Sequence, residues 1–142
     1  RSVLESHAAE HAANAADRRL VAVMEAACEQ AESALPADSQ AAVEAISDAN
    51  VRFHRALWEM SGQARCSAIL SSLAVPPMAL RNFRNFDQAG LRRSMDQHRE
   101  MIAAIVAGDA AWASAVMRAH VQAGRAVFRA ATARERRGRH AA

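Results

Sequence analysis

The sequence predicts an all-α protein, and three features of its composition and patterning support that fold class. Of the 142 residues, 51% are hydrophobic, many of these are alanine, and only 4% are aromatic. Five glycines and three prolines leave long stretches without helix breakers. Apolar residues recur at spacings of three and four, and no segment alternates with the period of two that a strand requires. A chain of this length suits one domain, so we expect an antiparallel bundle of six to seven helices.

Two helices are predicted before Pro36. The first covers residues 2–15, with Leu4 on its inward face. Asp17 is a suitable N-cap for the second, because its carboxylate can accept hydrogen bonds from backbone N–H groups of the first turn. That helix is expected to end near Leu35, since proline cannot continue a helix.

The central part of the chain predicts two more helices. Asp38 and Ser39 both offer an N-cap for a helix that ends near Ser61. Gly62 then takes the left-handed backbone conformation that often follows a helix. The next helix begins near Ala64.

The last part of the chain predicts a break and two long helices. Pro76-Pro77 removes two backbone donors and must kink or break the helix that contains it. The helical pattern is regular again from Leu91 to Ala107 and stops at Gly108. Asp109 is the expected N-cap of a final helix that continues past Phe128. The connections are short, which favours antiparallel neighbours.

One histidine lies on the apolar stripe of each of three predicted helices. His54 follows Phe53 directly, His98 lies three residues after Met95, and His120 lies among apolar residues of the final helix. A buried imidazole without hydrogen-bond partners is unfavourable. A shared metal ion would satisfy all three rings at once, and imidazole is the commonest protein ligand for metals. We therefore expect the three side chains to converge on one divalent metal ion.

Asn50 is a candidate for a fourth ligand. It precedes His54 by four residues, so its side chain lies one turn away on the same face of the helix. Three imidazoles and one amide oxygen leave a position open on a divalent ion, which a water or ligand can fill. None of these ligands is an anion, so we expect a carboxylate to bind at the open position of the ion. An arginine nearby would strengthen its binding.

Several residues form a pattern that is specific only in combination: Asn50, Phe53, His54, Leu57, Ser61-Gly62, His98, Gly108-Asp109 and His120. Its second histidine follows the first by 44 positions, and the third follows the second by 22. This pattern resembles the FCD domain, the FadR-type C-terminal effector-binding half of GntR-family bacterial transcription regulators. The resemblance extends from Arg1-x-x-Leu4-Glu5 to the end of the final helix. It places an FCD-like domain at residues 1–133, followed by a basic tail at 134–142 that we expect to be disordered.

The resemblance implies a helical bundle around a central cavity for a metal ion and its ligand. The metal ligands fall at Asn50, His54, His98 and His120, and zinc is the first choice of ion, with nickel or manganese as alternatives. A small organic acid would bind at the metal as effector, beside Arg1 and Arg81. The resemblance also implies a homodimer without enzyme activity. DNA would be bound only through a winged helix-turn-helix domain that this chain lacks.

The charge distribution agrees with that implication. The last fourteen residues hold five arginines and one glutamate, so they account for the whole net charge of +3, and the rest is close to neutral. Arg92 and Arg93 are interpreted as solvated. No apolar run approaches a membrane span, and two cysteines do not make a disulfide framework, so we expect a cytoplasmic protein. The sequence begins at Arg1 within a helical pattern, and we expect it to be a piece of a longer protein.

Two other functions remain open on the residues alone. A small metal-dependent enzyme could use an open three-histidine site to activate water, but it would need a nearby acid or base. The acidic residues of the histidine-bearing helices fall off their inward faces: Asp48, Glu59, Asp96 and Glu100. A metal-free interaction module would leave the histidines hydrogen-bonded to one another or to water. His7-Ala-Ala-Glu10-His11 fits a zinc-protease pattern, but those enzymes are far larger and need a further acidic ligand, so we interpret it as a solvated helix surface.

Overall fold

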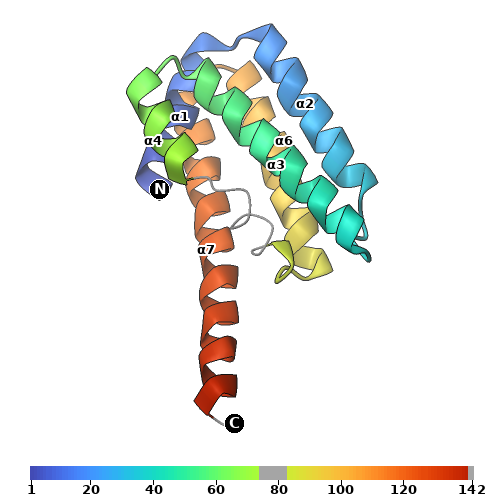
Figure 1. The fold of residues 1–142 in the computed structure, drawn as a ribbon. Helices are drawn as coiled ribbons and strands as arrows, with labels where there is room; N and C mark the ends of the chain where they lie inside the picture. Colours follow the sequence, from blue (N-terminus) through green and yellow to red (C-terminus); the bar gives the residue numbers. More distant parts are fainter. Residues whose placement is uncertain (74–82, 141–142) are drawn as a thin grey trace.

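The computed structural model describes residues 1–73 and 83–140, and within these ranges the chain is helical without strands (Figure 1). The all-α prediction is therefore confirmed. The helices, in chain order, are α1 (Ser2–Ala15), α2 (Arg18–Ser33), α3 (Gln40–Met60), α4 (Ala64–Leu73), α6 (Gln88–Val106) and α7 (Ala110–His140). The predicted break at Pro76-Pro77 and the candidate Arg81 lie outside the described residues.

The local signals at the helix ends act as predicted. Asp17 accepts hydrogen bonds from the backbone N–H groups of Arg19 and Leu20 at the start of α2, at 2.8 and 3.3 Å. Ser39, rather than Asp38, caps α3 by accepting from Ala42 N–H at 3.1 Å. Such caps satisfy donors that have no partner inside the helix.

The turns after α3 and α6 require glycine. Gly62 and Gly108 have φ values of 65° and 69°, in the left-handed region that residues with a Cβ rarely adopt. Asp109 then begins α7 by accepting a hydrogen bond from Trp112 N–H at 2.9 Å. These ends agree with the sequence prediction.

Two predicted boundaries differ from the structure. The start of α6 at Leu91 is wrong, because Asp87 caps the helix by accepting from Gly90 N–H at 2.7 Å and the helix begins at Gln88. Residues 134–140, which we expected to belong to a disordered tail, form the last turns of α7. Alanine and arginine are among the best helix formers, so the helix continues after it leaves the bundle.

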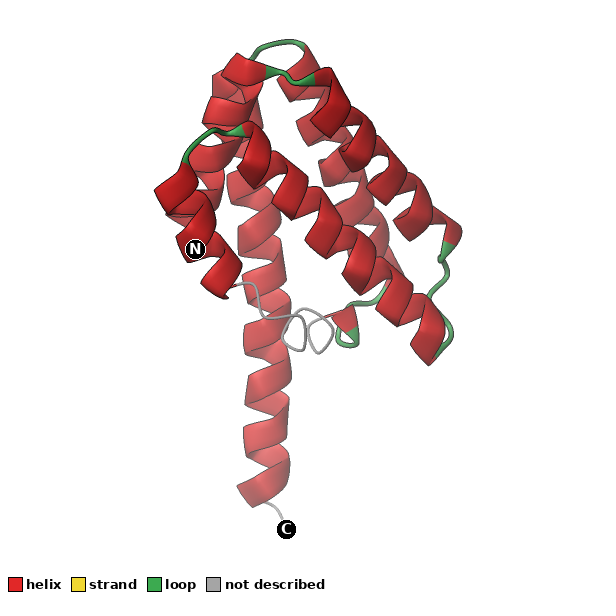
Figure 2. Ribbon diagram, turned by 45° about the horizontal axis from the view of Figure 1, so that its top comes forward, coloured by secondary structure: helices red, strands yellow, loops and turns green. Residues whose placement is uncertain are grey.

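The helices form a bundle in which α1 packs along α7, α2 packs against α3, and α6 packs against α7 (Figures 1 and 2). Helix α1 also contacts α3, α4 and α6. Its buried residues are mostly alanine, and small side chains let it approach its neighbours closely. Beyond the bundle, α7 projects by itself to the C-terminus in both views.

The main core lies between α1, α2, α3, α6 and α7. Its largest fully buried side chains include Phe53, Leu57, Met101, Ile105 and Met117. Each contributes about 1.5–3 kcal/mol of stabilisation by leaving water. This core brings the middles of α3, α6 and α7 together, and the three histidines of interest lie there.

Candidate metal centre

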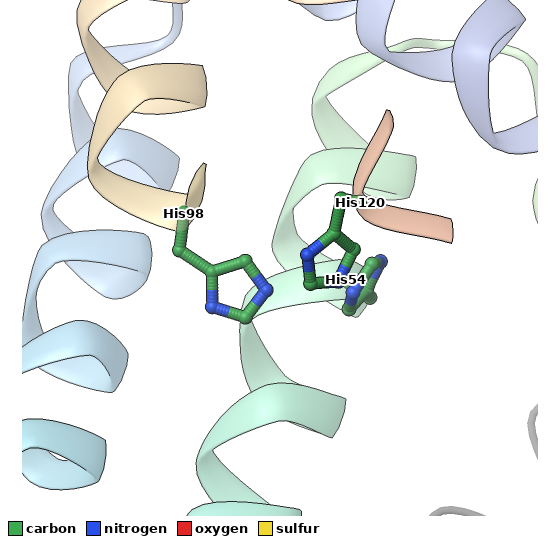
Figure 3. Close-up of side chains that lie close together, drawn as sticks. All are labelled: His54, His98 and His120. Carbon is green, nitrogen blue, oxygen red and sulfur yellow. The ribbon is translucent and has the colours of Figure 1, made fainter. Parts of the chain in front are cut away.

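The side chains of His54, His98 and His120, hereafter the histidine cluster, meet inside the bundle from three helices (Figure 3). Helix α3 carries His54, α6 carries His98 and α7 carries His120. One ring nitrogen of each lies within 4.8 Å of the others, and the ring centroids are 4.6–5.5 Å apart. The convergence predicted from the helical stripes is present.

Three nitrogens of the cluster have no hydrogen-bond partner among the described residues, although all three are buried: His54 Nε2, His98 Nε2 and His120 Nδ1. An unsatisfied buried polar atom costs about 1–3 kcal/mol, so three together call for a ligand. Nitrogens bound to one zinc ion at about 2.1 Å lie at most about 4.2 Å apart. The cluster therefore has nearly the dimensions that a divalent metal requires.

Packing of aromatic rings holds His98 in place. The Phe53 ring stacks on the imidazole of His98, with centroids 4.0 Å apart and an interplanar angle of 16°. Both side chains are almost fully buried. The neighbouring ring of His54 meets Phe53 edge-on at 5.7 Å, so the same phenylalanine contacts two members of the cluster.

The protonation of the cluster suits metal binding. Burial, followed by the charges of the other two histidines, lowers the pKa of His98 well below its usual 6.5. Burial and the charge of His54 lower the pKa of His120 to about 3. Both imidazoles are therefore neutral near pH 7, and the neutral ring is the form that binds a metal.

A buried carboxylate that the sequence did not predict stands beside the cluster. Glu5 of α1 is fully buried, and its Oε2 lies 3.1 Å from His54 Nδ1. Trp58 Nε1 donates to the same oxygen at 2.8 Å, and Arg1 Nε donates to Oε1 at 3.0 Å. Burial alone would raise the pKa of Glu5, but the charge and hydrogen bond of His54, the charge of Arg1 and the Trp58 bond lower it to about 2.

The face of α1 explains why Glu5 was missed. We predicted Leu4 to point inward, but Leu4 is only partly buried, whereas Glu5, Ala8 and Ala12 are fully buried. In an alanine-rich helix the apolar stripe has little contrast with the rest of the surface. The available signal was the spacing of Glu5 four residues after Arg1, which favours an ion pair on one face.

A cavity of about 660 Å³ opens beside the cluster and is lined by His54, His120 and Asn50. Asn50 is buried at 9% exposure and therefore lies where the sequence placed it, on the cavity side of α3.

Two arginines bring positive charge to the cavity. Arg1 lines it as predicted, and so does Arg93 of α6, which we had interpreted as solvated. The charges of both arginines contribute to lowering the pKa of His120, so both act at the cluster. The other candidate, Arg81, lies outside the described residues.

Other residues singled out in the sequence lie elsewhere. The four acidic residues of the histidine-bearing helices are exposed, as predicted: Asp48, Glu59, Asp96 and Glu100. The rings of His7 and His11 lie next to each other outside the cluster, with centroids 4.1 Å apart and an interplanar angle of 52°. Trp112 is 38% exposed and donates to Glu100 Oε1 at 2.9 Å. Trp58 is buried in the core.

Comparison with known protein families supplies the context for this site. A family model of the FCD domain matches residues 1–123. The chain belongs to the FCD domain family. FCD domains are the effector-binding domains of GntR-type transcription regulators, and such regulators are not enzymes. No individual curated protein matches the chain.

The matched range of this FCD domain includes all three histidines, Asn50 and Glu5. It ends within α7. No helix in the described part of the domain is both long and apolar enough to cross a bilayer.

Proposed function

We propose that this FCD domain senses a small organic acid that binds to a divalent metal ion held by His54, His98 and His120. The observation that carries the proposal is the set of three unpartnered buried ring nitrogens next to a cavity lined by arginine. Asn50, one turn before His54 on the same cavity wall, would supply an amide oxygen as fourth ligand.

The chemistry of the donors favours zinc, with nickel or manganese as alternatives. Imidazole nitrogens suit zinc and nickel, and an oxygen donor such as Asn50 is compatible with all three ions. A bound ion would supply an electrophilic position for one carboxylate oxygen of the effector. Because imidazole and amide groups that bind a metal bring no negative charge, the ion would keep its full charge, and Arg1 and Arg93 would add to the attraction for an anion.

The cavity also suggests the size and shape of the effector. Its volume of about 660 Å³ lies in the range of small-molecule sites, which is roughly 300–1,000 Å³. Phe83, Phe86 and Val121 also line it, so its lining is partly apolar. An acid with a carboxylate at one end and a hydrocarbon part at the other would suit the polar and the apolar parts of this lining.

Effector binding would act on DNA through the arrangement of the helices. An acid that contacts Arg1 of the α1 N-cap, Arg93 of α6 and the metal on α3, α6 and α7 would favour one arrangement of the bundle over another. In the full-length regulator, a homodimer of such domains would carry winged helix-turn-helix halves, and their spacing would follow this change. The chain described here would bind the effector but would not bind an operator specifically.

The proposal is tested by thermal unfolding of protein purified without an immobilised-metal column and stripped with a chelator. Zinc should raise the melting temperature, and a panel of small organic acids should include one that raises it further only when zinc is present. The uncharged amide of that acid is the matched control and should have little effect. Unchanged melting with zinc and with every acid would refute the proposal.

A further inference from the structure

Glu5 is the buried acid among the described residues, and hydrogen-bond donors surround both of its oxygens. Oε2 accepts a hydrogen bond from Trp58 Nε1 at 2.8 Å and lies 3.1 Å from His54 Nδ1. Oε1 accepts a hydrogen bond from Arg1 Nε at 3.0 Å. A carboxylate with two or three such donors is held in one orientation, and so are the side chains that donate to it.

These contacts make Glu5 a neighbour of the histidine cluster and not one of its members. The group of ligand atoms within 4.8 Å of one another contains the three histidines without Glu5. Its oxygens are already occupied by Arg1, Trp58 and His54. The direct contact of Glu5 with the cluster is therefore its hydrogen bond with His54.

The hydrogen bond to Glu5 decides which nitrogen of His54 carries the proton. An ionised carboxylate can only accept, so Nδ1 of His54 must donate to it. In a neutral imidazole the other nitrogen then keeps its lone pair. That other nitrogen, Nε2, is buried without a partner in the described structure, and the ring that carries it belongs to the cluster.

We propose that Glu5 is a positioning residue for the metal site: it holds His54 in the Nδ1–H tautomer and turns the lone pair of Nε2 toward the ion. This inference rests on the metal site proposed above and adds the residue that prepares it. Carboxylates that receive the second N–H of a metal-bound histidine fix its tautomer and its ring orientation and raise its basicity. Here the neutral Asn50 supplies no negative charge, so Glu5 brings the anion that contacts a member of the cluster.

The test replaces Glu5 with glutamine, which preserves the shape and removes the charge. Glu32→Gln is the matched control, because Glu32 also pairs with an arginine, Arg99, at 2.7 Å, but on the surface between α2 and α6. Both variants carry His7→Ala and His11→Ala, which remove a pair of adjacent histidines that could bind zinc elsewhere. Zinc affinity is measured by competition with a chromophoric chelator. We expect about a 10–100-fold loss for Glu5→Gln and less than about a twofold change for Glu32→Gln.

A second readout separates positioning from a purely structural role. Nitrogen-15 NMR of the metal-free protein reports which nitrogen of His54 is protonated. We expect Nδ1–H in the parent protein and in Glu32→Gln, and a mixture or the Nε2–H form in Glu5→Gln. A residue that only stabilised the fold would lower the melting temperature but leave the tautomer and the zinc affinity of the folded protein unchanged.

Two results would overturn the role of Glu5 while the proposed function survives. One is tight zinc binding by the parent protein with equal affinity in Glu5→Gln and Glu32→Gln. The other is an Nε2–H tautomer of His54 in the metal-free parent protein, a measurement that decides the matter even if Glu5→Gln fails to fold. If the parent protein takes up no zinc, the proposed function fails, and the positioning role falls with it.

Discussion

Replacing His98 with alanine should change the stability of the protein little when metal is absent and greatly when zinc is present. The side chain is 2% exposed and stacks on Phe53, so removing it leaves a hole that costs about 3 kcal/mol, as other large-to-alanine changes do. The same change removes a buried nitrogen that has no partner among the described residues. The variant no longer has the cost of burying that nitrogen, and this offsets about 1–3 kcal/mol of the loss. The metal-free variant should therefore be less stable than the parent by at most about 2 kcal/mol.

Zinc should widen that difference. At a free zinc concentration about 1,000 times the dissociation constant, binding stabilises the parent protein by about 4 kcal/mol. The variant has lost one of three imidazoles and should gain little of this. Urea unfolding, followed by circular dichroism with a chelator and then with zinc, should give a stability difference between parent and variant of at most about 2 kcal/mol in the first condition and about 4–6 kcal/mol in the second. Equal gaps in both conditions would remove His98 from the metal site.

Two further predictions concern the protonation of the cluster and the charge of the cavity. The folded-state pKa values of His98 and His120 are lowered by burial, so below about pH 6.5 the unfolded chain takes up protons that the folded chain does not. Stability of the metal-free protein should thus fall by about 2.5 kcal/mol between pH 7 and 5.5, and a urea midpoint that does not change over this range would contradict the buried, neutral state. Arg93→Ala should weaken binding of the active acid in calorimetry about tenfold, whereas Arg92→Ala, one residue away, should not, and equal affinities would exclude Arg93 from the effector site.

The parts of the fold that local chemistry decides could be predicted from the sequence. Asp17, Ser39 and Asp109 cap helices because their side chains satisfy the first backbone donors, whatever lies around them. Gly62 and Gly108 follow helices because the left-handed conformation is open to them. These signals need no knowledge of the tertiary structure.

The histidine cluster was predictable for a related reason. Helices α3 and α6 have strongly one-sided apolar patterns, so a histidine on the apolar stripe must point into the core. Three such helices in one small bundle share one core, and so the rings of His54, His98 and His120 meet.

Glu5 and Arg93 could not be placed in the same way. On α1 the buried side chains are mostly alanine, so periodicity does not separate the inward face from the outward one. Arg93 is exposed, yet it lines the cavity. The pattern of apolar residues along a helix does not distinguish an exposed residue that lines a cavity from any other surface residue. The helical end of α7 was also not predicted. Its residues have a high helix propensity and extend a helix that has already formed, so they stay helical without packing against other helices.

X-ray absorption spectroscopy of the zinc-loaded protein, in the His7→Ala and His11→Ala background, tests the central claim most directly. The account predicts one zinc ion per chain with three imidazole nitrogens at about 2.0–2.1 Å and an additional oxygen shell that changes when the effector acid is added. A first shell made of oxygens alone, or one that contains sulfur from Cys28 or Cys66, would contradict the proposed site.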